Sequence, residues 1–129
     1  MENPTDRKYS KEHEWAKLEG DIVVCGITDF AQSQLTDIVF VELPEKGKQI
    51  EKGKQAGVVE SVKSVSDIFV PVGGEIVEVN EEIVNNPDII NKTPFNEGWM
   101  FKIKVKDKAE LDSLMSAEEY TNMTKEDKH

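Results

Sequence analysis

The sequence predicts a mainly β fold, either a small barrel or a β-sandwich, on three observations. Short runs rich in Val and Ile recur along the chain, Gly and Pro separate these runs, and helical periodicity is scarce before the C-terminus. The 129 residues are enough for a single core and too few for two. We therefore expect one domain over 1–129, with disordered tails over 1–7 and 125–129.

The first quarter of the chain predicts a hairpin followed by a short helix. Two β-prone runs, 14–18 and 22–25, flank a turn that contains glycine, which is typical of a β-hairpin. Either Thr28 or Asp29 can act as the N-cap of a helix over 30–35. Asp29 also has a glutamine three residues later, which is the spacing of a capping box.

A buried strand and two exposed turns are predicted next. Residues 38–41 are all apolar and lie shortly before a Leu-Pro pair, so they predict a compact buried strand. The sequence Glu-Lys-Gly-Lys-Gln then occurs twice, over 45–49 and 51–55, on either side of Ile50. This short repeat predicts two solvent-facing turns around one buried residue, with glycine providing the positive φ angles.

Three further strands and the helices of the C-terminal part follow. Strands are predicted over 58–62 and 65–72, on either side of Lys63, and over 75–79, where apolar and polar residues alternate. Pro71 restricts the second of these to an edge or a bend.

A short helix is predicted to begin at Pro87 with Asn86 as its cap, and 99–105 alternates as a strand. The pattern becomes helical from Asp107, and Ser116 with a glutamate three residues later predicts a second, capped helix.

The charge of the chain excludes several classes of function. Sixteen Lys and Arg against 26 Asp and Glu give a net charge of −10, which argues against binding to nucleic acid or to an anionic membrane. Arg7 is the only arginine, so the chain has almost no side chains that could bind a phosphate group through two parallel hydrogen bonds. No apolar run approaches the ~18 residues of a membrane span, and the polar N-terminus has no signal-peptide core. A single cysteine fits a soluble protein of a reducing compartment.

Conventional catalytic arrangements find little support. Cys25 and His13 are a conceivable thiol–imidazole pair, but Cys25 lies in an apolar run where a small buried side chain is expected. The other histidine, His129, is the last residue, which leaves no basis for a histidine metal site. Phosphate-binding loops and nucleophile elbows are absent from the sequence. We therefore expect no catalytic residues and no metal.

Lys63 is the unusual position. Between residues 55 and 100 there are eight acidic residues and two lysines, a net charge of −6, and Lys63 is one of the two. From the residues alone, the favoured interpretation is a surface lysine paired with Glu60 or Asp67, worth under ~1 kcal/mol.

Resemblance to a known family changes this interpretation. The run Glu60-Ser61-Val62-Lys63-Ser64 resembles the lipoyl-attachment motif of the glycine cleavage system H protein. Further blocks of that family occur in order: His13-Glu14-Trp15, Gly26 to Gln32, Leu43-Pro44-Glu45 with Gly47, Val79-Asn80, Asn85, Pro87, Ile90-Asn91 and Gly98-Trp99-Met100. The similarity covers roughly residues 8–124. Glu12, where the family more often has a small hydroxyl residue, and Cys25, at a usually non-thiol position, depart from the pattern.

The resemblance implies a fold and a site. The fold is a flattened barrel-sandwich hybrid of the lipoyl-domain type, with short helices and a helical C-terminal segment. Lys63 would carry lipoate in amide linkage on a hairpin that also contains Glu60, Ser61, Val62 and Ser64. An acidic cleft for the loaded arm would contain Glu14 and Asp67, and Glu12 would add a further negative charge to it.

The resemblance also implies partners and a role. The protein would be a monomeric shuttle, not an enzyme. It would carry an aminomethyl group from a pyridoxal-phosphate glycine decarboxylase to a tetrahydrofolate-dependent aminomethyltransferase, and electrons to an FAD-containing dihydrolipoyl dehydrogenase. A lipoate ligase or lipoyl transferase would load it, in the cytoplasm or, for a processed eukaryotic protein, the mitochondrial matrix.

Several alternatives stay open at this point. One is an H-like carrier that relays lipoate to other proteins, and another is the lipoyl domain of a 2-oxoacid dehydrogenase, which usually has Asp before the lysine where this chain has Val62. A biotin carrier would normally place methionines on both sides of Lys63. The remaining alternatives are a small Cys-His enzyme and an unmodified interaction module.

Overall fold

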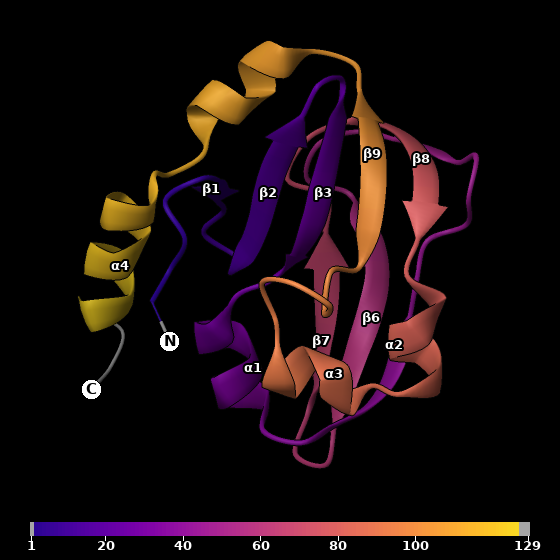
Figure 1. Ribbon diagram of the computed structural model, residues 1–129, viewed down its shortest axis with the longest axis vertical. Helices are drawn as coiled ribbons and strands as arrows, with labels where there is room; N and C mark the ends of the chain where they lie inside the picture. The colour runs from indigo at the N-terminus through magenta and orange to yellow at the C-terminus, as the bar shows by residue number, and fades with distance from the viewer. Residues whose placement is uncertain (1, 127–129) are drawn as a thin grey trace.

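The computed structural model describes residues 2–126, and within that range the chain forms two antiparallel sheets and several short helices (Figure 1). The strands are β1 (Lys8–Tyr9), β2 (Glu14–Glu19), β3 (Ile22–Ile27), β4 (Ile38–Glu42), β5 (Gln49–Ile50), β6 (Gln55–Ser61), β7 (Val65–Phe69), β8 (Gly74–Val79) and β9 (Phe101–Val105). The helices are α1 (Asp29–Leu35), α2 (Glu81–Asn85), α3 (Asp88–Lys92), the 3-10 helix η1 (Lys108–Ser113) and α4 (Ala117–Glu126). The mainly β prediction is confirmed.

The two sheets share one apolar core. The larger sheet has the strand order β1-β2-β3-β9-β8-β5, and the smaller has the order β4-β6-β7. Both contribute fully buried side chains, such as Val23 and Ile103 from the larger sheet and Val59 from the smaller one. The helices α1, α2 and α3 lie toward the same end of the molecule as the turn between β6 and β7 (Figure 1). None of the helices in the described part of the chain has the length and apolarity to span a membrane.

Three local predictions based on capping and glycine turns are confirmed. Thr28 caps α1, since its Oγ1 accepts a hydrogen bond from the amide of Ala31. The two Glu-Lys-Gly turns have φ of 94° at Gly47 and 85° at Gly53, and Ile50 between them is buried. At the start of α4, the Ser116 amide donates to the Glu119 carboxylate and the Glu119 amide to the Ser116 hydroxyl, which is the predicted capping box.

The prediction of a fully buried strand over 38–41 is wrong for its two middle residues. Val39 is 55% exposed and Phe40 46% exposed, whereas Ile38 and Val41 are buried. The cause is a bulge: Ile38 pairs with Ser61 and Phe40 with Glu60, so one extra residue stands in β4. A bulge breaks the two-residue alternation and turns consecutive side chains toward solvent.

Two smaller predictions also need correction. Pro87 is itself the N-cap of α3, and Asn86 instead ends α2, which was not predicted and is capped by Asn80. The expected disordered tail over 1–7 does not hold for residues 3–7, because Asn3 donates to Thr121 and other residues of the segment are held in similar contacts. Of the tail expected over 125–129, the first two residues belong to α4. Met1 and residues 127–129 lie outside the described residues, and the predictions for them stay predictions.

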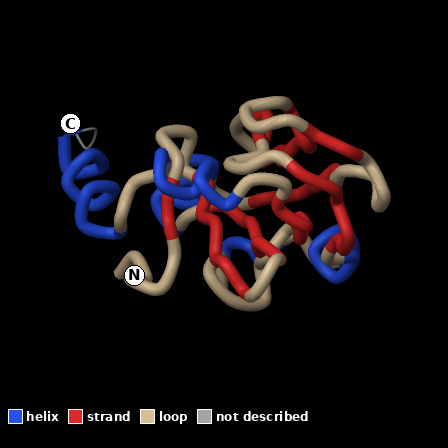
Figure 2. Tube along the Cα trace, turned by 90° about the horizontal axis from the view of Figure 1, so that it is seen from above, coloured by secondary structure: helices blue, strands red, loops and turns tan. Residues whose placement is uncertain are grey.

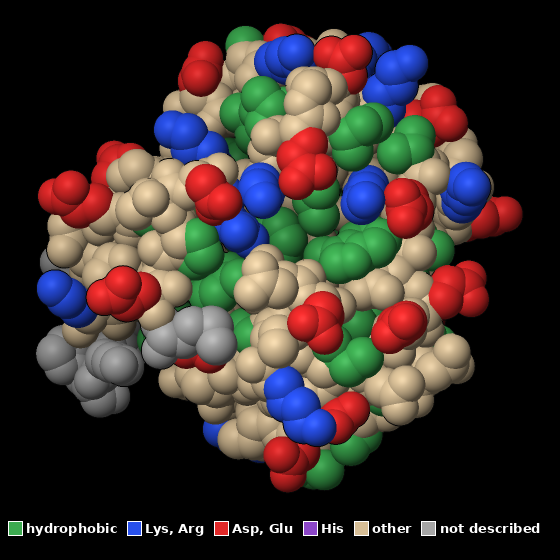
Figure 3. Space-filling view, in the orientation of Figure 1, with side chains coloured by type: hydrophobic (Ala, Val, Ile, Leu, Met, Phe, Trp, Pro, Cys, Tyr) green, Lys and Arg blue, Asp and Glu red, His purple; other side chains and the backbone are tan. Residues whose placement is uncertain are grey.

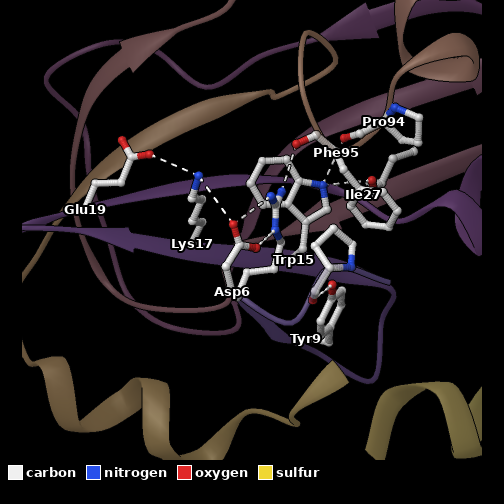
Figure 4. Close-up of polar contacts among 10 residues, drawn as sticks. Asp6, Tyr9, Trp15, Lys17, Glu19, Ile27, Pro94 and Phe95 are labelled. Carbon is white, nitrogen blue, oxygen red and sulfur yellow. Dashed lines mark hydrogen bonds and ion pairs between the residues drawn. The ribbon is translucent and has the colours of Figure 1, made fainter. Parts of the chain in front are cut away.

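Several of these N-terminal contacts involve Arg7. Its guanidinium donates to Asp6 at 2.8 Å and to the carbonyl of Phe95 at 2.8 Å, and it lies 4.6 Å from the centre of the Trp15 ring. Asp6 also pairs with Lys17 at 3.6 Å, a contact drawn as a dashed line in Figure 4. With these partners, the only arginine of the chain is a structural residue that joins the N-terminal segment to the larger sheet.

The C-terminal helix α4 lies beside the N-terminal segment (Figure 2). The Tyr120 ring stacks on the ring of Tyr9 at 4.9 Å, and the Tyr120 hydroxyl lies 2.7 Å from both Thr28 Oγ1 and His13 Nδ1. Both tyrosines are fully buried. The helix is therefore joined to the segment that leads into β2 and to the N-terminal end of α1.

Candidate functional site

Lys63 lies on the turn between β6 and β7, at one end of the molecule (Figure 1). Its side chain is exposed, and its Nζ donates a hydrogen bond of 3.3 Å to the carbonyl of Gln34 near the C-terminal end of α1. Glu60 stands opposite Val65 in the β6–β7 ladder, immediately before the turn. No ion pair of Lys63 occurs among the described residues, so the surface-pair interpretation with Glu60 or Asp67 finds no support.

The turn is closed by a serine side chain. Ser61 Oγ accepts hydrogen bonds from the backbone amides of Lys63 at 3.1 Å and Ser64 at 2.9 Å, and the Ser61 amide donates to the Ser64 carbonyl at 2.8 Å. Serine and threonine side chains can stabilise turns in this way. This explains how a turn forms without Gly, Pro or Asn, and it gives Ser61 a structural role that the sequence pattern did not reveal.

A second contact fixes the turn from outside the hairpin. The Val62 amide donates to the carbonyl of Asp37 at 3.0 Å, in the connection between α1 and β4. Asn91 of α3 holds that connection: its side-chain oxygen accepts from the Ile38 amide at 2.9 Å and its side-chain nitrogen donates to the Thr36 carbonyl at 2.8 Å. Thr36 has a φ of 66°, which is unfavourable for a β-branched residue. Asn91 therefore stabilises a strained segment on which the Lys63 turn rests.

Glu14 is a buried carboxyl group at the start of β2. Its side chain is 2% exposed, and its two oxygens accept hydrogen bonds from Ser10 Oγ at 2.9 Å and from the Phe69 amide of β7 at 3.0 Å. Burial, together with the negative charge of Glu12, raises the pKa of Glu14 to about 7, although the two hydrogen bonds oppose this shift. The group can therefore gain or lose a proton close to neutral pH.

The substitution Glu14→Gln is expected to remove a pH dependence of stability. The pKa of Glu14 is about 7 in the folded protein and about 4.5 when unperturbed, so the folded state binds its proton more tightly. The resulting stabilisation is complete below pH 4.5 and is lost as the pH rises through 7, an amount of about 3 kcal/mol. Urea unfolding at pH 5 and pH 8 measures it, and we expect the free energy of unfolding to fall less in the variant. Equal falls in both proteins would contradict a proton-binding Glu14.

Asp67 and Glu12 have different surroundings from Glu14. Both are exposed, and Asp67 accepts a hydrogen bond of 3.1 Å from the Gln55 side chain of β6. Asp67 lies on β7, two residues before Phe69, whose amide donates to Glu14. Both predicted cleft carboxylates are therefore positioned by β7. Glu12 is close enough to Glu14 to influence its pKa. No described contact joins Glu14 directly to Asp67.

The thiol–imidazole alternative is not supported by the geometry. Cys25 is buried in β3, and its burial raises the pKa of the thiol well above the ordinary value. His13 is half-buried, with its Nδ1 at 2.7 Å from the Tyr120 hydroxyl and its ring 4.8 Å from that of Phe30. Among residues 2–126 no group of three or more His, Cys, Asp or Glu side chains is arranged to hold a metal ion.

The acidic excess is distributed over the surface. On the face shown in Figure 3, acidic side chains lie among lysines and hydrophobic side chains. Several of the acids are paired with lysines, as in Lys102–Glu78 at 3.4 Å and Lys92–Asp88 at 3.1 Å. Exposed pairs of this kind contribute little to stability.

Comparison with known proteins decides which family has this arrangement. The family model described as glycine cleavage H-protein matches residues 7–127. The chain belongs to the glycine cleavage H-protein family. The glycine cleavage system H protein of Carboxydothermus hydrogenoformans is 52% identical over 124 residues, which are 96% of this chain and 95% of the relative. That of Symbiobacterium thermophilum is 53% identical over 123 residues, 95% of this chain and 96% of the relative.

A solved structure supports the same assignment. The crystal structure of a glycine cleavage system H protein from Mycobacterium marinum matches with a TM-score of 0.88 and 38% identity, over 95% of this chain and 98% of that chain. The expected barrel-sandwich fold of the lipoyl-domain type is thereby confirmed. The family assignment argues against a 2-oxoacid dehydrogenase lipoyl domain, a biotin carrier and a Cys-His enzyme.

Proposed function

We propose that this protein is the lipoyl-bearing shuttle of the glycine cleavage system, with lipoate attached to Lys63. The supporting observation is the position of Lys63 in a chain of this family: an exposed amine on a turn whose backbone is fixed by Ser61 and by the contact of Val62 with Asp37. A fixed anchor with a mobile side chain suits a group that must reach several active sites.

The residues around Lys63 fit the attachment of lipoate. The only hydrogen bond that the Lys63 ammonium donates within the described chain is to the Gln34 carbonyl, so acylation breaks few contacts. Ser61 and Ser64 are small and bonded to the turn itself, which leaves the amine accessible. An amide removes the lysine charge and takes the net charge of the chain from −10 to −11. When attached, lipoate supplies a disulfide that accepts a one-carbon amine and two electrons.

Glu14 and Asp67 are proposed to line the cleft that protects a loaded, cationic arm. A buried carboxyl group with a pKa of about 7 ionises readily when a cation approaches, and the ion pair then stabilises the charged form. Asp67 lies on β7, the strand that follows the Lys63 turn, four residues after Lys63 in the sequence. Glu12 is proposed as a weaker contributor, because it is exposed to solvent.

The proposed role makes the protein a cosubstrate and not an enzyme. Its partners would be the glycine decarboxylase, the aminomethyltransferase, dihydrolipoyl dehydrogenase and the enzyme that attaches lipoate. The bacterial relatives favour a cytoplasmic location. A tethered arm gains up to about millimolar effective concentration at each partner, so the protein contributes delivery rather than proton transfer.

Exchange of bicarbonate into glycine tests this function against lipoate relay. Purified protein, lipoylated by a ligase, is mixed with the pyridoxal-phosphate glycine decarboxylase of a glycine cleavage system, glycine and labelled bicarbonate. We expect label in glycine only when the lipoylated protein is present. A lipoylated protein that supports no exchange but passes lipoate to other proteins would favour the relay alternative.

Removing both cleft carboxylates is expected to shorten the life of the loaded carrier. The double variant Glu14→Ala with Asp67→Ala should accept lipoate normally and release ammonia roughly tenfold faster after loading, because hydrogen bonds to a charged group contribute about 1.5–3 kcal/mol. Ammonia release is followed without aminomethyltransferase. The matched control is Glu51→Ala with Asp112→Ala, two exposed acids elsewhere. An unchanged lifetime in the first double variant would rule out the cleft assignment.

A further inference from the structure

Exposed apolar side chains gather around the Lys63 turn. Six large hydrophobic residues are substantially exposed in the described chain, and four of them belong to this turn or to the strands beside it. The four, called here the hairpin patch, are Val39 (55% exposed), Phe40 (46%), Val62 (70%) and Val65 (63%). The other two, Leu18 and Val84, lie on β2 and α2.

The strand register brings these residues together. Phe40 of β4 pairs with Glu60 of β6, and Glu60 pairs with Val65 of β7, so the three side chains form one row on the outer face of the smaller sheet. Val39 is the extra residue of the β4 bulge next to Phe40, and the Val62 amide bonds to the residue before β4. The bulge is the reason that two apolar residues of β4 face solvent here.

Acidic residues lie within the hairpin patch and in the row beside it. Glu42 of β4 and Asp67 of β7 flank Val58 in the next outward-facing row, and Glu60 lies within the first row. The strands β4, β6 and β7 contain neither Lys nor Arg, so Lys63 is the one cation of the hairpin. A partner that covers this surface needs an apolar centre with basic residues around it.

We propose that the hairpin patch is the docking surface for the enzyme that acylates Lys63, and that it selects this lysine from the others. The chain has fifteen lysines, so fourteen others compete with Lys63, and Lys63 is the one that lies on the turn between β6 and β7. The enzyme must place an activated lipoyl carbonyl, such as a lipoyl adenylate, against the Lys63 amine. The N–C bond then forms, the bond from the carbonyl carbon to the adenylate phosphate oxygen breaks and releases AMP, and the Lys63 ammonium gives up two of its three protons to solvent, with the third staying on the amide nitrogen. This inference rests on the proposed function.

The test compares patch variants with matched exposed residues. Phe40→Ser and Val65→Thr alter the patch, and Leu18→Ser and Val84→Thr alter side chains of comparable exposure elsewhere, at 43% and 45%. The kcat/KM of lipoylation by a purified lipoate ligase with ATP is measured for each unmodified protein. The Val65→Thr change keeps the shape of the side chain, so it tests the patch even if Phe40→Ser disturbs the fold. Circular dichroism and acetylation of Lys63 by a small reagent control for folding and for the intrinsic reactivity of the amine.

We expect Phe40→Ser to lower kcat/KM roughly tenfold to a hundredfold and Val65→Thr to lower it several-fold, with both controls close to wild type. The rate should also fall as ionic strength rises, because the acidic surroundings attract a basic partner. Patch variants lipoylated at the wild-type rate would overturn the inference while leaving the proposed function intact. A patch variant that is lipoylated normally but fails in bicarbonate exchange would likewise overturn it and assign the surface to the decarboxylase. A wild-type protein that never accepts lipoate would overturn both proposals.

Discussion

Lys63→Arg is expected to abolish the acceptance of lipoate and all glycine-dependent turnover, while leaving the fold unchanged. An arginine side chain stays protonated at physiological pH and does not act as an acyl acceptor. Within the described part of the chain, the exposed Lys63 side chain makes a single hydrogen bond of 3.3 Å, so its replacement should change stability by no more than about 0.5 kcal/mol. The measurement is glycine-dependent reduction of NAD in a system reconstituted from the four components, which should fall to the level obtained without this protein.

The matched control is Lys92→Arg. Lys92 is also exposed, and it pairs with Asp88 on the same helix, a contact that arginine can keep. This variant should support turnover at the wild-type rate. Turnover by Lys63→Arg above the background level would show that another residue carries the lipoyl group.

Gly57→Ala is expected to destabilise the protein by about 3 kcal/mol and to lower its melting temperature by roughly 10 °C. Gly57 lies in β6, where the added Cβ would overlap the carbonyl oxygen of Glu42 in β4 and stand 3.2 Å from its carbonyl carbon. Backbone atoms in a paired strand cannot move aside without breaking the β4–β6 ladder. Thermal melting followed by circular dichroism measures the loss.

Gly20→Asn is the control for the glycine change. Gly20 has a φ of 67°, which asparagine tolerates, and no atom lies within 4 Å of an added Cβ. Its melting temperature should stay within a few degrees of wild type. A Gly57→Ala protein as stable as the Gly20→Asn control would contradict the close approach of β4 and β6.

Much of the fold could be predicted because local rules decide it. Glycines at positive φ, the Thr28 cap and the Ser116–Glu119 capping box act within a few residues, and these were found where the sequence placed them, whereas the predicted Asn86 cap was not. The β4 bulge could not be predicted in this way. Whether Phe40 faces the core depends on the register between β4 and β6, which no local pattern in either strand specifies.

The candidate site likewise has features that could be predicted from the sequence and features that could not. Lys63 was located from the resemblance of the residues around it to a known motif, whereas composition alone favoured an ordinary surface lysine. The roles of Ser61 and Asn91 could not be predicted, since Asn91 acts on a segment more than fifty residues earlier in the chain. For Glu14, a carboxylate in a surface cleft was expected, and the structure adds that it is buried and bonded to the backbone of β7. A position of that kind depends on the packing of β2 against β7.

The measurement that tests the central claim most directly is the intact mass of the protein after incubation with a purified lipoate ligase, lipoate and ATP, followed by peptide mapping. Attachment at Lys63 predicts a single lipoyl increment per chain, found entirely on the peptide that contains residues 60–64, with the other lysines unmodified. No mass increment with a ligase that lipoylates a proven substrate, or an increment on any other lysine, would contradict the account.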